Sequence, residues 1–296
     1  MFADGRLMPE QAFDDAPDAT VRVASLRGVD VAQLVLAEID LSGCLFTGTV
    51  HLDQLRLEGV CSFDKVAPGT RWQIWRPARF TQRRVLAEEH HWRANRPTAV
   101  PGWKAGEPSA GHIGPAQLAP VYRALRKTFE DGKNEPDAAD FYYGECEMRR
   151  HDVGRPWGER ALLSAYWALS GYGLRATRAL AWLGAAMAAT IAVMMLWGLP
   201  ADDPKPTITG RQVTAGQKIV LIADTPAPVN PTGPLIERVT TERWEKSLRV
   251  VINSVVFRSS GQDLTTRGTY TEMFSRLAEP VLLGLVVLAI RSRVKR

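Results

Sequence analysis

The longest apolar run in the sequence extends over 21 residues, from Ala179 to Leu199, and contains no charged residue. At about 1.5 Å per residue, a helix of this length crosses the roughly 30 Å hydrocarbon core of a bilayer. Trp182 and Trp197 lie near its two ends, where amphipathic rings settle at headgroup level. The run predicts a membrane-spanning helix, and a buried helix of a soluble protein is the alternative.

A second apolar stretch, Leu277 to Ile290, is shorter and includes Glu279. On length alone it does not cross a bilayer, so we expect the helix to start earlier and to cover about residues 271–290. An acidic side chain in such a helix is expected to face other helices or a cavity, which makes Glu279 a candidate pore residue. The alternative is a C-terminal helix that only dips into the membrane.

The segments around these spans predict a membrane module over residues 161–296. Its first part, 161–174, is apolar and aromatic but too short to cross, and indicates a helix at the membrane interface. The span 179–199 follows, then an extracytoplasmic loop, 200–270. We expect four aromatic residues at the two membrane interfaces: Trp167, Tyr172, Trp182 and Trp197.

Basic residues flank both spans on one side, which predicts the orientation. Six arginines precede the first span and four Lys or Arg residues crowd the last six positions. Short basic flanks mark the cytoplasmic side, so we expect a multi-pass protein of the cell membrane with both termini in the cytoplasm.

The N-terminal part has a hydrophobic spacing that is typical of neither a strand nor a helix. Apolar residues recur every five positions and then every eleven, and a fixed short period indicates a solenoid. The segment ASLRG-VDVAQ-LVLAE-IDLSG-CLFTG resembles the pentapeptide-repeat family, which implies a right-handed quadrilateral β-helix. Two or three ordinary strands are the alternative. The expected core residues are Leu26, Val31, Leu36, Leu41, Phe46, Leu52, Leu57 and Phe63.

Four regions follow from these patterns, and the expected fold is mixed. Residues 1–96 are predicted to form the short β-solenoid with its cap, and the Pro/Gly-rich residues 97–119 a linker. An apolar stripe at helical spacing, a DGKN turn and a following proline predict a cytosolic helical hairpin over 120–160. The membrane module completes the chain.

Two strings carry a second resemblance, FYYGE-x-EMRR and GYGLR. With the span after them, they resemble bacterial membrane proteins that join pentapeptide repeats to a two-helix module, in some members similar to a potassium-channel pore. That likeness implies an amphipathic pore helix near Trp244 to Phe257. The place of the filter reads RSSGQDLTTRG, whereas a potassium filter needs consecutive carbonyls on a glycine-bearing strand. Selective potassium conduction is therefore not expected.

Small residues in the first span are spaced so that helices can approach closely. Gly184 and Ala188 lie four positions apart, as in small-xxx-small helix pairs. They are candidate contacts for helix pairing within the chain or between copies, or for a pore. Ordinary alanine-rich filling of a span has the same appearance.

The charge is distributed unevenly along the chain. The net charge is +5, but residues 1–65 carry −6, which leaves +11 on the remainder. Because the basic residues are interleaved with apolar segments, they indicate anionic lipid headgroups rather than nucleic acid. The three cysteines have no ligand spacing and predict reduced thiols.

Candidate catalytic chemistry is sparse. We find no nucleotide-binding, nucleophile-elbow or zinc-protease motif. The string LAEEHHWR is the nearest to a metal cluster, but a solvated helical face is the favoured interpretation. We expect no catalytic, cofactor-binding or metal-binding residues and no cofactor.

The sequence therefore predicts a non-enzymatic integral membrane protein. A cytosolic repeat unit in the N-terminal half would bind an unknown protein partner, and a channel-like hairpin would anchor it in the lipid bilayer, with homo-oligomers expected. The alternative is an oligomeric non-selective pore or ion channel. A weaker alternative is a DNA-mimicking, gyrase-binding repeat protein, suggested by the acidic first 65 residues.

Overall fold

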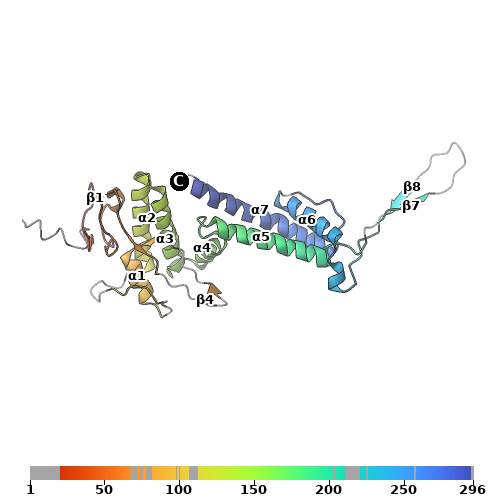
Figure 1. The fold of residues 1–296 in the computed structure, drawn as a ribbon, viewed down its shortest axis with the longest axis horizontal. Helices are drawn as coiled ribbons and strands as arrows, with labels where there is room; N and C mark the ends of the chain where they lie inside the picture. Colours follow the sequence, from red (N-terminus) through yellow and green to blue (C-terminus); the bar gives the residue numbers. More distant parts are fainter. Residues whose placement is uncertain are drawn as a thin grey trace, which may run out of the picture. The chain divides into compact units, whose positions relative to one another are not determined.

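The chain divides into two compact units, with the boundary between Ala165 and Tyr166 (Figure 1). A computed structural model describes residues 21–67, 72–73, 76–77, 82–97, 99, 101–106, 113–202, 205–210, 221–224, 226–256 and 258–294. The first 20 residues of the predicted region 1–96, parts of the predicted linker 97–119 and residues 203–204, 211–220, 225 and 257 of the predicted loop 200–270 lie outside this range.

The start of unit 1 pairs with itself through short parallel contacts. Strand β1 (Val35–Ala37) lies parallel to β2 (Arg56–Glu58), and η2 (Leu52–Gln54) precedes β2. Four isolated parallel bridges join residues 18–22 positions apart: Arg22 with Asp40, Ser25 with Leu45, Asp30 with Val50, and Asp40 with Ser62.

The predicted fold class is wrong. The described part of the chain is mainly helical, its strands are two to four residues long, and they pair only two by two, without a closed or solenoid β-helix. The physical reason is size: about 43 residues at this spacing bury too little surface to stand alone, so their apolar side is covered by helices. The predicted repeat architecture is therefore wrong as well. The DNA-mimic alternative depended on that architecture and loses its basis.

The five-residue spacing nevertheless corresponds to a row of buried side chains. Seven of the eight expected core residues are at most 8% exposed, and they share one core with the helices of unit 1. Leu57 is the exception, because η2 shifts the spacing and places Leu55 in the core, 2% exposed, while Leu57 is half-buried.

A helical hairpin covers this row. Helix α2 (Pro115–Asp131) and α3 (Glu135–His151) follow one another across a short turn. Pro115 suits the first turn of α2, which therefore begins within the predicted linker, and the Asn134 side chain caps α3 by accepting from the Asp137 amide. The ring of Phe141 packs 5.0 Å from Phe63. The hairpin thus closes the core that the N-terminal segment leaves open.

Helix α1 (Ala87–Ala94) lies beside this core. It carries most of the buried Glu, Arg and His side chains of unit 1. Strand β6 (Arg84–Val85) leads into α1 and pairs with β3 (Asp64–Lys65), while β4 (Trp72–Gln73) pairs with β5 (Arg76–Pro77). Helix α4 (Trp157–Ser170) runs across the boundary between the units.

Unit 2 is built on two long helices with a shorter one packed against both (Figure 1). Helix α5 (Ala176–Val193) continues into the π-helical turn η4 (Met194–Gly198), and α7 (Thr266–Val294) is the longest helix. Between them in sequence come the hairpin of β7 (Thr207–Gly210) and β8 (Leu221–Asp224), then η5 (Leu235–Arg238) and α6 (Thr241–Val255).

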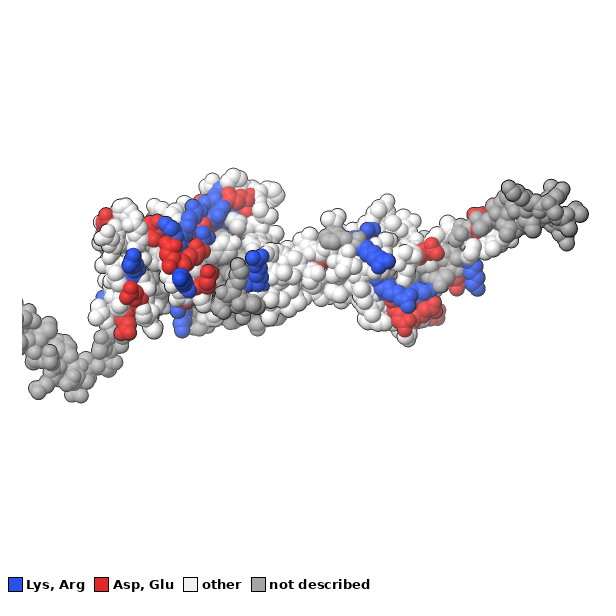
Figure 2. Space-filling model, turned by 90° about the horizontal axis from the view of Figure 1, so that it is seen from above, with Lys and Arg blue, Asp and Glu red and all other residues white. Residues whose placement is uncertain are grey.

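Both long helices are long and apolar enough to cross a membrane. The segments Ala176–Gly198 and Thr266–Arg291 meet that test, so α7 starts before the predicted 271–290. Only 33% and 22% of their apolar windows are buried, unlike the core helix of a soluble protein. Figure 2 shows a mostly white surface where these helices lie, and charged atoms toward the α6 end.

Gly144 sets the distance between α2 and α3. A Cβ added there would lie 2.3 Å from the Tyr122 ring, whereas one at Gly158 would meet nothing within 4 Å. We expect Gly144→Ala to destabilise unit 1 by about 1–3 kcal/mol through overpacking, and Gly158→Ala to have little effect. All three cysteines are buried in unit 1, so the temperature at which a thiol-reactive dye labels the protein measures its unfolding. Equal midpoints for the two variants would contradict this packing.

Candidate functional site

The three helices of unit 2 meet at the end of the first apolar span. The last carbonyls of a helix have no partner within it and need one elsewhere. Arg243 of α6 donates to three carbonyl oxygens at this end, that of Met195 in the last turn and those of Leu199 and Pro200 just after it, at 2.7–3.0 Å. Arg238 donates to the Leu196 carbonyl at 2.7 Å. A positive charge also suits the negative end of the α5 dipole.

The start of α7 is fixed to the same place. The Thr265 hydroxyl donates to the Trp197 carbonyl at 2.8 Å, and the Thr265 amide donates to that of Gly198. Gly198 and Gly268 allow the two backbones to touch, since a Cβ at Gly268 would lie 2.2 Å from the Gly198 oxygen. The end of α5 and the start of α7 therefore form one junction.

Helix α6 folds back from this junction against both spans. Val251 packs with Ile191 and Met195 of the first span. Near the other end of α6, the hydroxyls of Ser254 and Ser275 lie 2.9 Å apart. The segment that follows α6 returns to α7, and Gly261 there has a φ of +65°. Helix α6 thus packs against both long helices, and the chain after it returns to the junction at Gly198.

A row of polar residues lies on the inner face of α7. Glu272, Ser275 and Glu279 are spaced by three and four positions and are buried. Glu272 accepts from the Ser260 amide at 2.7 Å, and Glu279 contacts the Thr190 hydroxyl at 2.9 Å. In the single chain Glu279 therefore lies between α5 and α7, fully buried, and not on an exposed pore face.

The aromatic residues expected at the interfaces have different surroundings. Trp182 is 49% exposed, and its ring nitrogen donates to the Ala168 carbonyl. Trp167 and Trp197 are half-buried. Tyr172 is 1% exposed, in a turn in which three consecutive residues have positive φ, and its ring packs on Tyr166. Its place in that turn gives it a packing role in the chain.

The small residues of the first span are on an exposed face. Gly184 and Ala188 are both exposed, and a Cβ at Gly184 would meet nothing within 4 Å. The contact of α5 with α7 uses Ala179 and Leu183 instead. Pairing of this stripe within the chain is therefore not observed in the described residues, and the stripe is left available to lipid or to another copy.

Unit 1 contains a buried ion network centred on Glu89. This side chain is fully buried and accepts from Arg83 at 2.6 and 2.8 Å, from Arg93 at 2.7 Å and from the Tyr122 hydroxyl. Burial alone would raise the pKa of the Glu89 carboxyl, but the charges of both arginines and these hydrogen bonds lower it to about 2. The carboxylate is thus ionised in the core.

The network extends to α3 through a second acid. Arg93 lies 3.4 Å from Glu147, which also accepts from Arg150 at 2.6 Å. Glu145, two residues before Glu147 on α3, accepts from Arg123 and Arg126 of α2. Charged hydrogen bonds therefore connect α1 to α3 and α2 to α3.

The expected solvated face of LAEEHHWR is wrong. Glu88 and Glu89 are 0% exposed and His90 is 1% exposed. Glu88 accepts from the amides of Phe46 and Thr47, so it fixes the N-terminal segment to α1. The signal that we missed is position: these acids follow strand β6 in a helix of only eight residues, which also carries Trp92 and Arg93.

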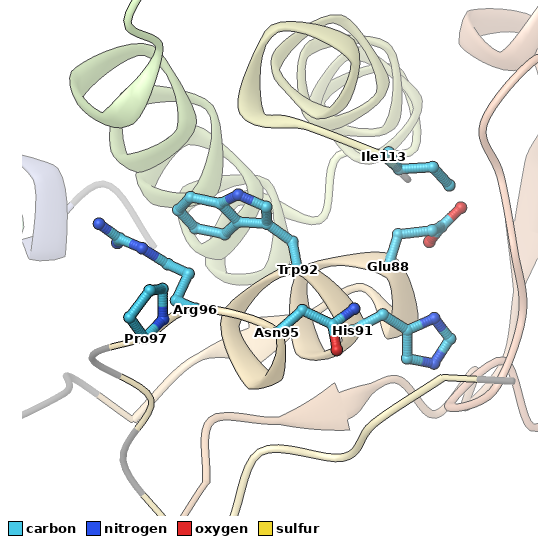
Figure 3. Close-up of a pocket in the computed structure, with 7 residues that line it drawn as sticks. All are labelled: Glu88, His91, Trp92, Asn95, Arg96, Pro97 and Ile113. Carbon is cyan, nitrogen blue, oxygen red and sulfur yellow. The ribbon is translucent and has the colours of Figure 1, made fainter. Parts of the chain in front are cut away.

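A small pocket lies beside α1. Figure 3 shows Trp92 and Arg96 on one side and Glu88 on the other, next to Ile113. Its volume of about 200 Å³ is below the ~300–1,000 Å³ of most small-molecule sites. No group of three or more potential metal ligands is present among the described residues.

Comparisons with protein families, curated proteins and solved structures find no match to this chain.

Replacing Glu89 tests the ion network. Removing one partner of a buried ion pair costs about 3–5 kcal/mol, because the remaining charges stay buried. We expect Glu89→Gln to lower the unfolding midpoint of unit 1, measured with the thiol-reactive dye. The control is Glu130→Gln, since the Glu130 side chain is 46% exposed and an exposed pair contributes about 0–1 kcal/mol. An unchanged midpoint in Glu89→Gln would refute the network's role.

The same carboxyl gives a pH dependence. A pKa that is lowered on folding stabilises the protein above the unfolded value of about 4.5, and this contribution is lost as the pH falls toward about 2. Calorimetry of the wild type between pH 3 and 7, in roughly unit steps, should show this loss. The Glu89→Gln variant should lack that part of the slope.

Proposed function

We propose that the protein is a non-enzymatic integral membrane protein of the cell membrane, with two spans and both termini in the cytoplasm. Unit 2 is its membrane module and assembles from several copies. Unit 1 is its cytosolic unit and binds a protein partner. The presence of two helices long and apolar enough to cross a bilayer supports the membrane location.

One observation carries the proposal: α6 folds back against both long helices from a junction in which Arg243 and Thr265 satisfy the end of the first span. A soluble protein can leave such carbonyls to water, whereas a membrane protein cannot. Non-helical backbone at membrane depth is tolerated where protein satisfies it, and in the segment after α6 the Ser260 amide donates to the Glu272 carboxylate of α7.

Exposed apolar residues support assembly of several copies. The first span presents Gly184 and Ala188, which allow close approach of a neighbouring helix. Helix α7 exposes Phe274 (74%) and Leu277 (69%) near its start. Helices from neighbouring copies would cover this surface together with lipid.

A groove in unit 1 supports a partner. It has a volume of about 910 Å³ and lies between β2 and the end of α2, lined by Asp53, Arg56, Glu58, Lys127 and Asp131 among others. Its charged groups of both signs suit a polar protein segment rather than a nucleic acid, whose phosphates require a cationic surface.

Cysteine labelling tests the topology. Val153 of unit 1 is 80% exposed and Thr232 lies exposed in the loop before η5, so each suits a reporter cysteine. In intact cells we expect an impermeant maleimide to label Thr232→Cys and not Val153→Cys, and the reverse in inverted vesicles. Native background is low, because burial raises the pKa of Cys44 to about 12 and of Cys146 to about 11. Labelling of both reporters from one side would contradict two spans.

An oligomeric pore is the second candidate. It is favoured by α6, which packs against both long helices and is followed by a polar segment that returns to α7, as in channels with a pore helix. Among residues 258–265, Gly261 alone has a positive φ, so we expect a pore without preference for potassium.

Planar bilayers test the pore. Purified protein should give similar conductance in potassium and sodium chloride. Gly268→Ala should abolish it by separating α5 from α7, whereas Gly284→Ala on the same helix should not, because a Cβ there meets nothing within 4 Å. Conductance no greater than background in every salt would rule the pore out and leave the anchor.

A further inference from the structure

Glu279 lies near the middle of the α7 segment that is long enough to cross a membrane, and it is 0% exposed. Its Oε1 lies 2.9 Å from the Thr190 hydroxyl, and its Oε2 is buried without a hydrogen-bond partner. The carboxyl therefore sits inside the pair of spans with one neutral contact. The question is whether this carboxyl is ionised or protonated.

The surroundings do not neutralise a carboxylate. On α7 the nearest charged residues are Glu272 and Arg276, and α5 carries no charge between Arg178 and Gly198. Helix α6 contributes the hydroxyl of Ser254 on this side. Among the described residues Glu279 forms no ion pair, unlike Glu89, and an isolated carboxylate in an apolar interior is strongly disfavoured.

The Thr190 contacts identify the proton. Its hydroxyl lies 3.0 Å from the Ala186 carbonyl and 2.9 Å from Glu279 Oε1, but a hydroxyl has one hydrogen. The Ala186 carbonyl can only accept. Both contacts are hydrogen bonds at once when Glu279 carries a proton on Oε1 and donates it to Thr190, which then donates to Ala186. Oε2 is then an uncharged carbonyl oxygen, the less costly group to leave without a partner.

A route for this proton follows the inner face of α7. Ser275 and Glu272 lie one and two turns from Glu279 toward the start of the helix. Along the helix axis, Glu272 is about 10 Å from Glu279. Glu272 is bonded to the amide of Ser260, which is half-buried at the edge of the module. The row thus joins the buried carboxyl to the segment between α6 and α7.

We propose that Glu279 is a proton-binding site in the membrane module, a neutral carboxylic acid that exchanges its proton with solution through Ser275 and Glu272. The proposal rests on the proposed function only in that α5 and α7 cross the bilayer. Its ligand is the proton, and Thr190 is a positioning residue.

The probe is dicyclohexylcarbodiimide, which reacts in apolar surroundings with a protonated carboxyl. The acid proton goes to a carbodiimide nitrogen and the carboxyl oxygen bonds to the central carbon; the acyl group then moves to nitrogen, so no atom is lost. The full-length protein in lipid nanodiscs at neutral pH should gain one adduct, located at Glu279 by peptide mass spectrometry. Glu279→Gln should lose it, and the matched Glu272→Gln should retain it.

Two further measurements make the outcome decisive. A water-soluble carbodiimide should modify exposed acids such as Glu130 and leave Glu279 unmodified. Infrared spectra should contain the carbonyl band of a protonated carboxyl that shifts in D₂O and is absent in Glu279→Gln. Protein that resists alkaline extraction from membranes yet shows neither adduct nor band would overturn the proposal. Protein that is extracted would instead overturn the membrane proposal.

Discussion

The end of η4, which continues α5, has carbonyl groups that have no partner within that helix, and the arrangement of unit 2 depends on how they are satisfied. Arg243 donates to three of them and Thr265 to two more. Because Arg243 belongs to α6 and Thr265 immediately precedes α7, one chemical requirement fixes the start of both helices. The close approach of Gly198 to Gly268 follows from the same junction. The arrangement of the helices of unit 2 is thus fixed at one end.

Unit 1 solves a different problem, since its N-terminal segment cannot close a core alone. The hairpin of α2 and α3 provides the apolar contact, and buried charged side chains fix the position of α1. Glu88 holds the backbone at Phe46 and Thr47, while Glu89 holds Arg83 and Arg93. Apolar packing alone tolerates small shifts, whereas these bonds require one register of α1.

The sequence predicts some of this and not the rest, for physical reasons. The uncharged run before Leu199 and the stripe of α2 are local patterns, and each corresponds to a helix in the structure. The five-residue spacing is local too, but the fold it belongs to depends on which partner covers it, and there the β-helix prediction is wrong. Arg93 lies four positions after Glu89 on the same helix, a spacing that the sequence does show. The Tyr122 partner of Glu89 and the carbonyl partners of Arg243 come from distant elements, so no spacing in the sequence reveals them.

Glu89 and Glu279 are equally buried, yet their surroundings imply different protonation states, ionised for Glu89 and neutral for Glu279. Glu89 meets two guanidinium groups and a phenol, which together compensate for lost water and keep it ionised. Glu279 meets one hydroxyl whose own hydrogen is needed by a backbone carbonyl. Burial by itself therefore says little about an acid; the number and kind of donors around it decide. An acid with one such contact in an apolar interior is more stable in its neutral, protonated form, and its charge can change only when water or a cation reaches it.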